Sequence, residues 1–356
     1  MTSLANDTSR SVDTIWFTRC AGGGRGGVPT ASGIAYNLGY LTEEFKADGI
    51  KLLTLQEDAG PELQHNHYDH QLETLIREGG NLFAIPAKSQ GARTRLIGLT
   101  WIDEGQAILV RPDSTIRSAT DLKGKRLALP AFRPADITEN RRGRSIARYM
   151  SLHGYKGVLA SVGLTLDDVK LVEVNGDVAP EHVRGGFEQS YQPLLDGEVD
   201  AIYVKGAPAA DAARRYGLVT GIDLDKLERR FRVNNGTPRP VTVHEDFLEN
   251  HFDLLVRFLY QTLRAAEWAK TNLKSVLGIL QSETGSTAEG VAAAYKDGFH
   301  LSLAPDLSTE RLELFRQQKD FLLTYGVLDR DFDFDAWVDQ RPLEEAQRRL
   351  RKVLAA

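Results

Sequence analysis

Two short stretches in the first quarter of the chain hold the residue types with the clearest chemical potential, and the first contains a cysteine. Cys20 is the only cysteine among 356 residues, and it closely follows an apolar run, residues 14–18, that predicts a buried strand. Ligands of open α/β sheets bind at the carboxyl ends of strands, and the glycine run at 22–27 cannot fill a core. These features favour a reactive thiol over the alternative of a buried structural cysteine.

The second stretch begins with a histidine-rich run, residues 65–70. His67 can orient a thiol and move protons, because the pKa of histidine lies near neutral pH. His67 and His70 can instead share a helix face and bind a metal, but no second cluster supplies further ligands. A third interpretation, a helix cap with exposed histidines, stays open.

Arg77 lies ten residues after His67, and Gly79 and Gly80 follow it. We expect Arg77 to end a helix over about residues 68–77, with Gly79 and Gly80 forming the turn into a strand at 82–85. An arginine fork and aimed backbone amides are what a bound anion requires, and Arg77 and Gly80 can supply both. The alternative is a solvated arginine at a helix end and an ordinary C-cap glycine.

Two further motifs are open to more than one interpretation. The glycine run lacks the Lys-Ser or Lys-Thr ending of a P-loop and the spacing of a dinucleotide fingerprint, so it suits a mobile gate or a flexible loop. The basic cluster of Arg141, Arg142, Arg144 and Arg148 suits a solvated helix start or recruitment of an anionic substrate. We predict no metal and no cofactor.

The elements that must position these residues alternate in type. Apolar runs at 51–55, 95–100 and 106–110 predict strands, and residues 34–46 predict a helix. This alternation predicts mostly parallel sheets flanked by helices. From residue 245 onward, apolar residues spaced three and four apart predict a helical C-terminal region.

The same alternation starts again near residue 121 and continues to a strand predicted at 169–174. Residues 194–203 echo residues 75–83, each interpreted as a helix end, a glycine turn and an apolar strand. Residues 231–240, with two asparagines and two prolines, predict a connection that returns the chain. We therefore predict two lobes with a ligand cleft between them: lobe I from 1–115 and 235–356, which carries the catalytic residues, and lobe II from 116–234.

Composition limits the partners and the compartment. A length of 356 residues suits two domains, and a net charge of -5 provides no basic field for nucleic acid. The polar N-terminus lacks the pattern of a secretory signal, and charges interrupt every apolar run before it reaches membrane-spanning length. A single cysteine excludes an internal disulfide. We expect a cytoplasmic monomer that binds neither nucleic acid nor membrane.

Two phrases resemble known proteins at the level of fold. Residues 116–129, with Asp121-Leu122-Lys123-Gly124-Lys125-Arg126, and residues 195–201 resemble segments of solute-binding proteins for sulfonates, nitrate and thiamine precursors. The resemblance implies a two-lobed α/β fold of the periplasmic-binding-protein type II class. It carries no information about the ligand.

The whole chain also resembles the hydroxybiphenyl sulfinate desulfinase family of dibenzothiophene desulfurisation. The strongest points are Cys20 with Thr30-Ala31-Ser32, His67-Tyr68-Asp69, Arg77-Glu78-Gly79-Gly80, and residues 93–98 and 321–324. In that family a cysteine, a histidine, an arginine and a glycine amide gather around the sulfinate, which implies these roles for Cys20, His67, Arg77 and Gly80. The glycine-rich segment after Cys20 departs from the family pattern, so the pocket wall must differ there.

The resemblance implies cofactor-independent cleavage of an aryl carbon–sulfur bond with release of sulfite from a small aromatic anion. Cys20 can be the nucleophile on sulfur or the acid that protonates the ring carbon. The alternatives are a non-catalytic solute-binding protein for an aromatic or sulfonated anion, and an arene decarboxylase of the same fold. The pyrimidine-synthesising relatives are disfavoured, because their cysteine-rich motif cannot be built with one cysteine.

Overall fold

The computed structural model describes residues 12–19, 30–132, 145–174, 191–296 and 298–355. Its largest sheet has five strands in the order β2-β1-β3-β10-β4. Strand β1 pairs in parallel with β2 and β3, whereas β10 runs antiparallel to both β3 and β4. The strands of this sheet are β1 (Thr14–Arg19), β2 (Lys51–Thr54), β3 (Leu75–Glu78), β4 (Thr94–Thr100) and β10 (Arg239–His244).

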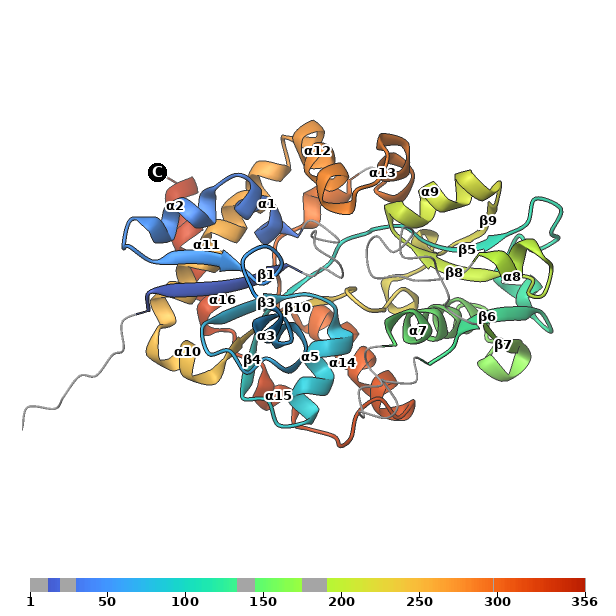
Figure 1. Cartoon of the computed structure of the whole chain (residues 1–356), viewed down its shortest axis with the longest axis horizontal. Coiled ribbons are helices and arrows are strands. Elements are labelled where there is room, and N and C mark those ends of the chain that lie inside the picture. Colours follow the sequence, from blue (N-terminus) through green and yellow to red (C-terminus); the bar gives the residue numbers. More distant parts are fainter. Residues whose placement is uncertain (1–11, 20–29, 133–144, 175–190, 297, 356) are drawn as a thin grey trace, which may run out of the picture.

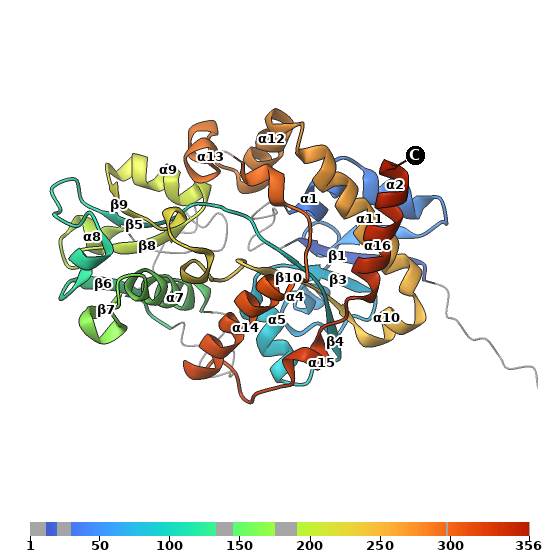
Figure 2. The ribbon, with the colours of Figure 1, turned by 180° about the vertical axis from the view of Figure 1, so that it is seen from behind.

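Helices cover both faces of the five-stranded sheet. Successive residues of a strand point to opposite faces, and neighbouring residues of β3 contact helices on opposite sides: Arg77 bonds to His67, whereas Glu78 bonds to Ser32. Figures 1 and 2 show the same two groups, which the contacts between elements also define. One group contains α1 (Ala31–Asn37), α2 (Tyr40–Lys46), α10 (Glu245–Asn250), α11 (Phe252–Ala269) and α16 (Arg341–Leu354). The other contains α3 (Pro61–Gln64), α4 (Asn66–Asp69), α5 (Asn81–Ser89), α14 (Thr309–Thr324) and α15 (Phe334–Trp337).

The main core lies between this sheet and α11. Leu255, Phe258 and Leu259 of α11 are buried, as their spacing predicts. The ring of Phe258 meets that of Phe17 from β1 edge-on, with 5.2 Å between the ring centroids. The predicted helical C-terminal region is confirmed, and it buries the sheet that carries the candidate site.

The other end of the molecule is built on two smaller sheets (Figure 1). An antiparallel sheet has the order β8-β5-β9, and β6 pairs in parallel with β7. Strand β5 thus hydrogen-bonds to the second part of the chain, although it precedes residue 116. The elements are β5 (Gln106–Val110), β6 (Arg126–Pro130), β7 (Lys170–Val174), β8 (Ile202–Lys205), β9 (Val219–Asp223), α7 (Ile146–Ala160), α8 (Gln192–Leu195) and α9 (Ala207–Tyr216).

The chain crosses between the two ends of the molecule more than once. Strand β10 returns the chain to the five-stranded sheet after residues 231–238, as predicted. Helices α12 (Leu273–Thr284) and α13 (Ala288–Ala294) then reach across from α1 to α9. In the described part of the chain, no helix is long and apolar enough to cross a membrane.

Three predicted elements are wrong. Residues 68–77 are not one helix: α4 ends at Asp69, His70 adopts a left-handed conformation with φ 56°, and β3 follows. Residues 82–85 are not a strand but the first half of α5, so the echo between residues 75–83 and 194–203 is not structural. The helix predicted at 34–46 is divided into α1 and α2 by Gly39, which has φ 77°.

Candidate functional site

The carboxyl ends of β1 and β3 bring the described site residues together. Strand β1 ends at Arg19, and Cys20 together with the glycine run lies outside the described residues. In the parallel ladder Thr18 lies opposite Arg77. This register places the carboxyl ends of β1 and β3 at the same edge of the sheet, where α/β folds bind ligands.

Arg77 is a buried strand residue rather than the helix-end residue that the sequence predicted. Its side chain is only 1% exposed. Nε donates to the carbonyl of His67 at 2.8 Å, and Nη2 donates to the carbonyl of Gly80 at 3.0 Å. One guanidinium therefore links the α4 segment to the start of α5, and it holds three of the predicted site residues in one cluster.

His67 is buried and bonded through its ring. Its Nδ1 lies 3.1 Å from Oγ1 of Thr18, and this hydroxyl also accepts a hydrogen bond of 2.7 Å from Nε2 of Gln56. Burial, with further contributions from the charge of Arg77 and from His70, holds the pKa of His67 well below its usual value. The imidazole is therefore neutral at physiological pH, and the interpretation of His67 as an exposed cap residue is wrong.

Aromatic rings surround the same imidazole. The ring centroids of Tyr68 and Phe83 each lie 5.3 Å from that of His67, and these two rings meet edge-on at 4.7 Å. Such edge-on arrangements are favoured by the ring quadrupoles. The histidine thus has a polar contact on one side and an aromatic wall on the other.

Gly79 and Gly80 are required by close packing. A Cβ atom on Gly79 would lie 3.1 Å from Nη2 of Arg77 and 3.2 Å from Cε1 of His67. A Cβ atom on Gly80 would lie 2.4 Å from Oδ1 of Asn235, an oxygen that accepts a hydrogen bond of 3.1 Å from the amide of Leu82. Gly80 is the N-cap residue of α5, so its interpretation as a C-cap is wrong.

A second buried polar cluster lies on the opposite face of the sheet. Glu78 accepts hydrogen bonds from the hydroxyls of Ser32 and Thr100, the latter at 2.8 Å. Burial raises the pKa of Glu78. Beside it, Arg19 forms ion pairs of 3.2 Å with Glu57 and 3.3 Å with Glu283. These pairs neutralise the cation that directly precedes Cys20.

Other predicted features do not join the site. His70 faces β10, where its Nδ1 lies 3.3 Å from Oγ1 of Thr242, and burial lowers its pKa to about 3. Among the described residues no group of three or more His, Cys, Asp or Glu side chains is arranged to hold a metal ion. Arg148 donates to the carbonyl of Pro130 and pairs with Glu173, whereas residues 141–144 lie outside the described ranges.

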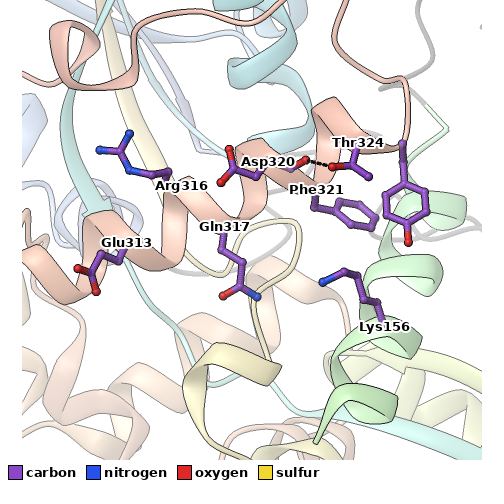
Figure 3. A pocket seen from close by; sticks show the side chains of 8 residues that line it. Lys156, Glu313, Arg316, Gln317, Asp320, Phe321 and Thr324 are labelled. Atoms are coloured by element: carbon purple, nitrogen blue, oxygen red, sulfur yellow. Dashed lines mark hydrogen bonds between the residues drawn. The ribbon is translucent and has the colours of Figure 1, made fainter. Parts of the chain in front are cut away.

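A separate pocket of about 340 Å³ lies between α7 and α14 (Figure 3). Phe321 and Thr324, from the segment that resembles the desulfinase family, line it together with Lys156. The ring of Phe321 stacks on His153 with centroids 4.0 Å apart. This segment therefore packs α14 against α7 rather than approaching His67.

The sequence does not single out Thr18, Gln56 or Asn235 as site residues. Thr18 contacts His67, Gln56 contacts Thr18, and a Cβ atom on Gly80 would meet the side chain of Asn235. Thr18 carried a signal, since it is a hydroxyl residue near the end of an apolar strand. The Asn-Asn-Gly turn that contains Asn235 also stood out, but only as a connection.

Comparisons with known proteins agree with this fold. A family model described as NMT1/THI5 like matches residues 34–273. The 2'-hydroxybiphenyl-2-sulfinate desulfinases of Rhodococcus erythropolis and Rhodococcus qingshengii are each 26% identical to this chain over 377 aligned positions, which cover 95% of both proteins. The resemblance predicted from the sequence is thus confirmed as a distant similarity over nearly the full length.

Solved structures extend the comparison. A cysteine-to-serine mutant of DSZB in complex with biphenyl-2-sulfinic acid has a TM-score of 0.73 at 23% identity, covering 95% of this chain and 99% of that one. The periplasmic sulfonate-binding protein SsuA of Methylobacillus flagellatus has a TM-score of 0.73 at 16% identity, covering 96% of this chain and 95% of that one. These likenesses confirm the α/β periplasmic-binding-protein type II fold.

Proposed function

Because the chain belongs to the NMT1/THI5-like family and is similar to a desulfinase over nearly its full length, we propose that it is an aromatic sulfinate desulfinase. It cleaves an aryl carbon–sulfur bond and releases sulfite. The observation that carries this proposal is the cluster of His67, Arg77 and Gly80 beside the end of β1, one residue before Cys20.

The reaction consumes one water. Oxygen from water is added to sulfur to give sulfite, and a proton replaces sulfur on the aryl carbon. Cys20 supplies the thiol, either as the nucleophile on sulfur or as the acid toward carbon, and His67 is its partner. Neither role requires a cofactor.

The buried positive charge of Arg77 is the main feature that would bind the sulfinate anion. Arg77 is a buried cation, and an anion beside it is stabilised more strongly than it would be in water. Gly80 opens α5, a helix of nine residues whose positive end favours an anion. Tyr68 and Phe83, beside His67, favour an aryl group on the substrate.

The test is sulfite release from biphenyl-2-sulfinate by the full chain, compared with Cys20→Ser and His67→Gln. We expect release by the wild-type protein, none by Cys20→Ser, and a reduction of at least about a hundredfold for His67→Gln, the lower range for loss of an acid–base group. Binding of the same compound by each variant, measured by calorimetry, separates turnover from affinity. Equal release by Cys20→Ser and wild type would refute the proposal.

A second candidate function is non-catalytic binding of an aromatic or sulfonated anion. The likeness to the sulfonate-binding protein, equal in TM-score to that with DSZB, favours it. This function predicts calorimetric binding of sulfonates and sulfinates without sulfite release. It also predicts that Cys20→Ser leaves the affinity unchanged, whereas Arg77→Gln weakens it.

Compartment, assembly and lobe boundaries belong to the same proposal. We propose a cytoplasmic monomer with a substrate cleft between a lobe I of 1–115 and 235–356 and a lobe II of 116–234. The single cysteine suits a reducing compartment. The strand pairing of β5 with β8 and β9 suggests moving the first boundary toward residue 105.

A further inference from the structure

A chain of three hydrogen-bonded side chains runs behind the imidazole of His67. Nε2 of Gln56 donates to Oγ1 of Thr18 at 2.7 Å, and the same oxygen lies 3.1 Å from Nδ1 of His67. Gln56 follows β2, Thr18 belongs to β1, and His67 belongs to α4. Three neighbouring elements therefore converge on one hydroxyl.

The proton inventory of these three side chains favours one direction. An amide nitrogen can only donate, so Thr18 Oγ1 accepts from Nε2 of Gln56. If Oγ1 also accepted from Nδ1 of His67, the hydroxyl proton would have no acceptor among the three side chains, whereas donation of that proton to Nδ1 satisfies it. In the favoured arrangement Nδ1 accepts, which it does only when it carries no proton. A neutral imidazole with a bare Nδ1 carries its one proton on Nε2.

Close neighbours restrict rotation of the imidazole away from this bond. Nε of Arg77 holds the His67 carbonyl at 2.8 Å, and the backbone of Gly79 passes so close to the ring that an added Cβ atom would lie 3.2 Å from Cε1. The rings of Tyr68 and Phe83 confine the imidazole at centroid distances of 5.3 Å. This packing keeps Nδ1 of His67 on Oγ1 of Thr18.

We propose that Gln56, acting through the hydroxyl of Thr18, fixes His67 as the tautomer that is protonated on Nε2. Gln56 and Thr18 are then positioning residues. The catalytic consequence rests on the proposed function: His67 enters the reaction as a proton donor through Nε2 toward a sulfinate oxygen, and it does not remove a proton from the thiol through Nε2.

The test replaces the hydrogen-bond donor at residue 56 by a group that can only accept. In Gln56→Glu a carboxylate, which can only accept, replaces the amide. Thr18 must then give its proton to residue 56 and accept from Nδ1, so Nδ1 of His67 must gain a proton. The protonation of each ring nitrogen is read from long-range ¹H–¹⁵N correlation spectra of the ¹⁵N-labelled full chain, with the His67 signals assigned by their loss in His67→Gln.

In the wild-type protein we expect an unprotonated Nδ1 and a protonated Nε2. In Gln56→Glu we expect a protonated Nδ1, whether the ring is the other neutral tautomer or an imidazolium. Gln64→Glu makes the same chemical change on the exposed surface of α3 and should leave the wild-type pattern. A protonated Nδ1 in the wild-type protein, or an unprotonated Nδ1 in folded Gln56→Glu, overturns the proposal.

These spectra need neither substrate nor turnover, so the two proposals fail separately. A wild-type protein that releases no sulfite but shows the expected tautomers refutes the desulfinase alone. A protein that releases sulfite with Nδ1 protonated refutes the role of Gln56 alone.

Discussion

Arg77 shows most directly how single residues build the candidate site. Its side chain is buried, and its fork holds backbone carbonyls of residues ten positions before it and three positions after it. Because Arg77 bonds to the backbone carbonyls of both His67 and Gly80, it holds the backbone that carries the imidazole close to the start of α5. The Arg77 side chain therefore stabilises the local backbone whether or not an anion is bound.

This double role predicts the effect of Arg77→Lys. A lysine keeps the charge but lacks the planar fork, so it cannot reach both carbonyls. We expect the free energy of unfolding to fall by about 1–3 kcal/mol, the cost of an unsatisfied buried polar group, together with a loss of sulfite release. Arg93→Lys, at an exposed ion pair with Asp246, is the matched control and should change little. Urea unfolding curves like those of wild type would contradict this role for Arg77.

The buried imidazole of His153 should make the stability of the protein depend on pH. Burial, with a smaller contribution from Lys156, lowers the pKa of His153 to about 3, below the usual value of 6.5. Between pH 3 and pH 6.5 the imidazole binds a proton in the unfolded chain but not in the folded protein. The stabilising contribution of neutral His153 to the free energy of unfolding is therefore fully present above pH 6.5 and is lost as pH falls toward 3.

We therefore expect His153→Phe, which retains stacking on Phe321, to become more stable relative to wild type by about 1 kcal/mol for each pH unit below 6.5. Urea midpoints at pH 7 and pH 5 measure this difference. His65→Gln, at an exposed histidine, serves as the control. Parallel changes in wild type and His153→Phe would contradict the prediction.

Between elements, the contact of α9 with α13 joins the two ends of the molecule (Figure 1). Asp211 of α9 accepts from the amide of Thr287 at 2.8 Å and from its hydroxyl, and Thr287 is the N-cap residue of α13. A Cβ atom on Gly290 would lie 2.3 Å from Oδ1 of Asp211. The helices can approach this closely only because residue 290 is glycine.

Gly290→Ala should therefore push α9 and α13 apart and lower the free energy of unfolding by about 1–3 kcal/mol, the usual cost of overpacking. Gly278→Ala in α12 is the control, since a Cβ atom there meets nothing within 4 Å and alanine favours a helix by about 1 kcal/mol. In a double-mutant cycle, Asp211→Ala should relieve much of the cost. A neutral Gly290→Ala would show that this contact does not constrain the packing.

The strands of the five-stranded sheet show which elements can be predicted from sequence. Predicted ranges for β1, β2 and β4 agree with the structure to within two residues, because each is an apolar run bounded by polar residues. Where β3 lies, the sequence predicts the end of a helix instead, and this strand contains Arg77 and Glu78. Both charges are buried, and the partners of Glu78, Ser32 and Thr100, lie 46 and 22 residues away.

Some residues of the candidate site can likewise be predicted from the sequence, and others cannot. His67, Arg77 and the two glycines were identified by residue type, spacing and family resemblance. Thr18 and Gln56 were missed, because their importance depends on strand register and on a contact across 38 residues. Likewise, Asn235 reaches the start of α5 from 153 residues away. Register and long-range contacts of this kind are set by tertiary packing.

For the molecule as a whole, a buried ion pair lies where the chain passes between its two ends. Nζ of Lys205, at the end of β8, lies 2.5 Å from Oε1 of Glu104 and donates to the carbonyl of Asn235 at 2.9 Å. The side chains of Lys205 and Glu104 are 1% and 4% exposed. The pair thus ties β8 to both connections between the five-stranded sheet and the smaller sheets.

Removal of one partner should be more damaging than removal of both charges. Lys205→Met leaves a buried carboxylate without its nearest cation, which costs about 3–5 kcal/mol. Adding Glu104→Gln removes the uncompensated charge and should restore a large part of the loss. Both variants are compared with wild type by urea unfolding. A double variant no more stable than Lys205→Met would contradict the importance of this pair.

The most direct measurement of the proposed activity follows both halves of the cleaved substrate. The full chain is incubated with biphenyl-2-sulfinate in D₂O, and sulfite and biphenyl are quantified together. We predict equimolar products, one deuterium on the biphenyl carbon that carried sulfur, and neither product with Cys20→Ser. Recovery of intact sulfinate that binds to the wild-type protein would contradict the desulfinase and leave an anion-binding protein of this fold.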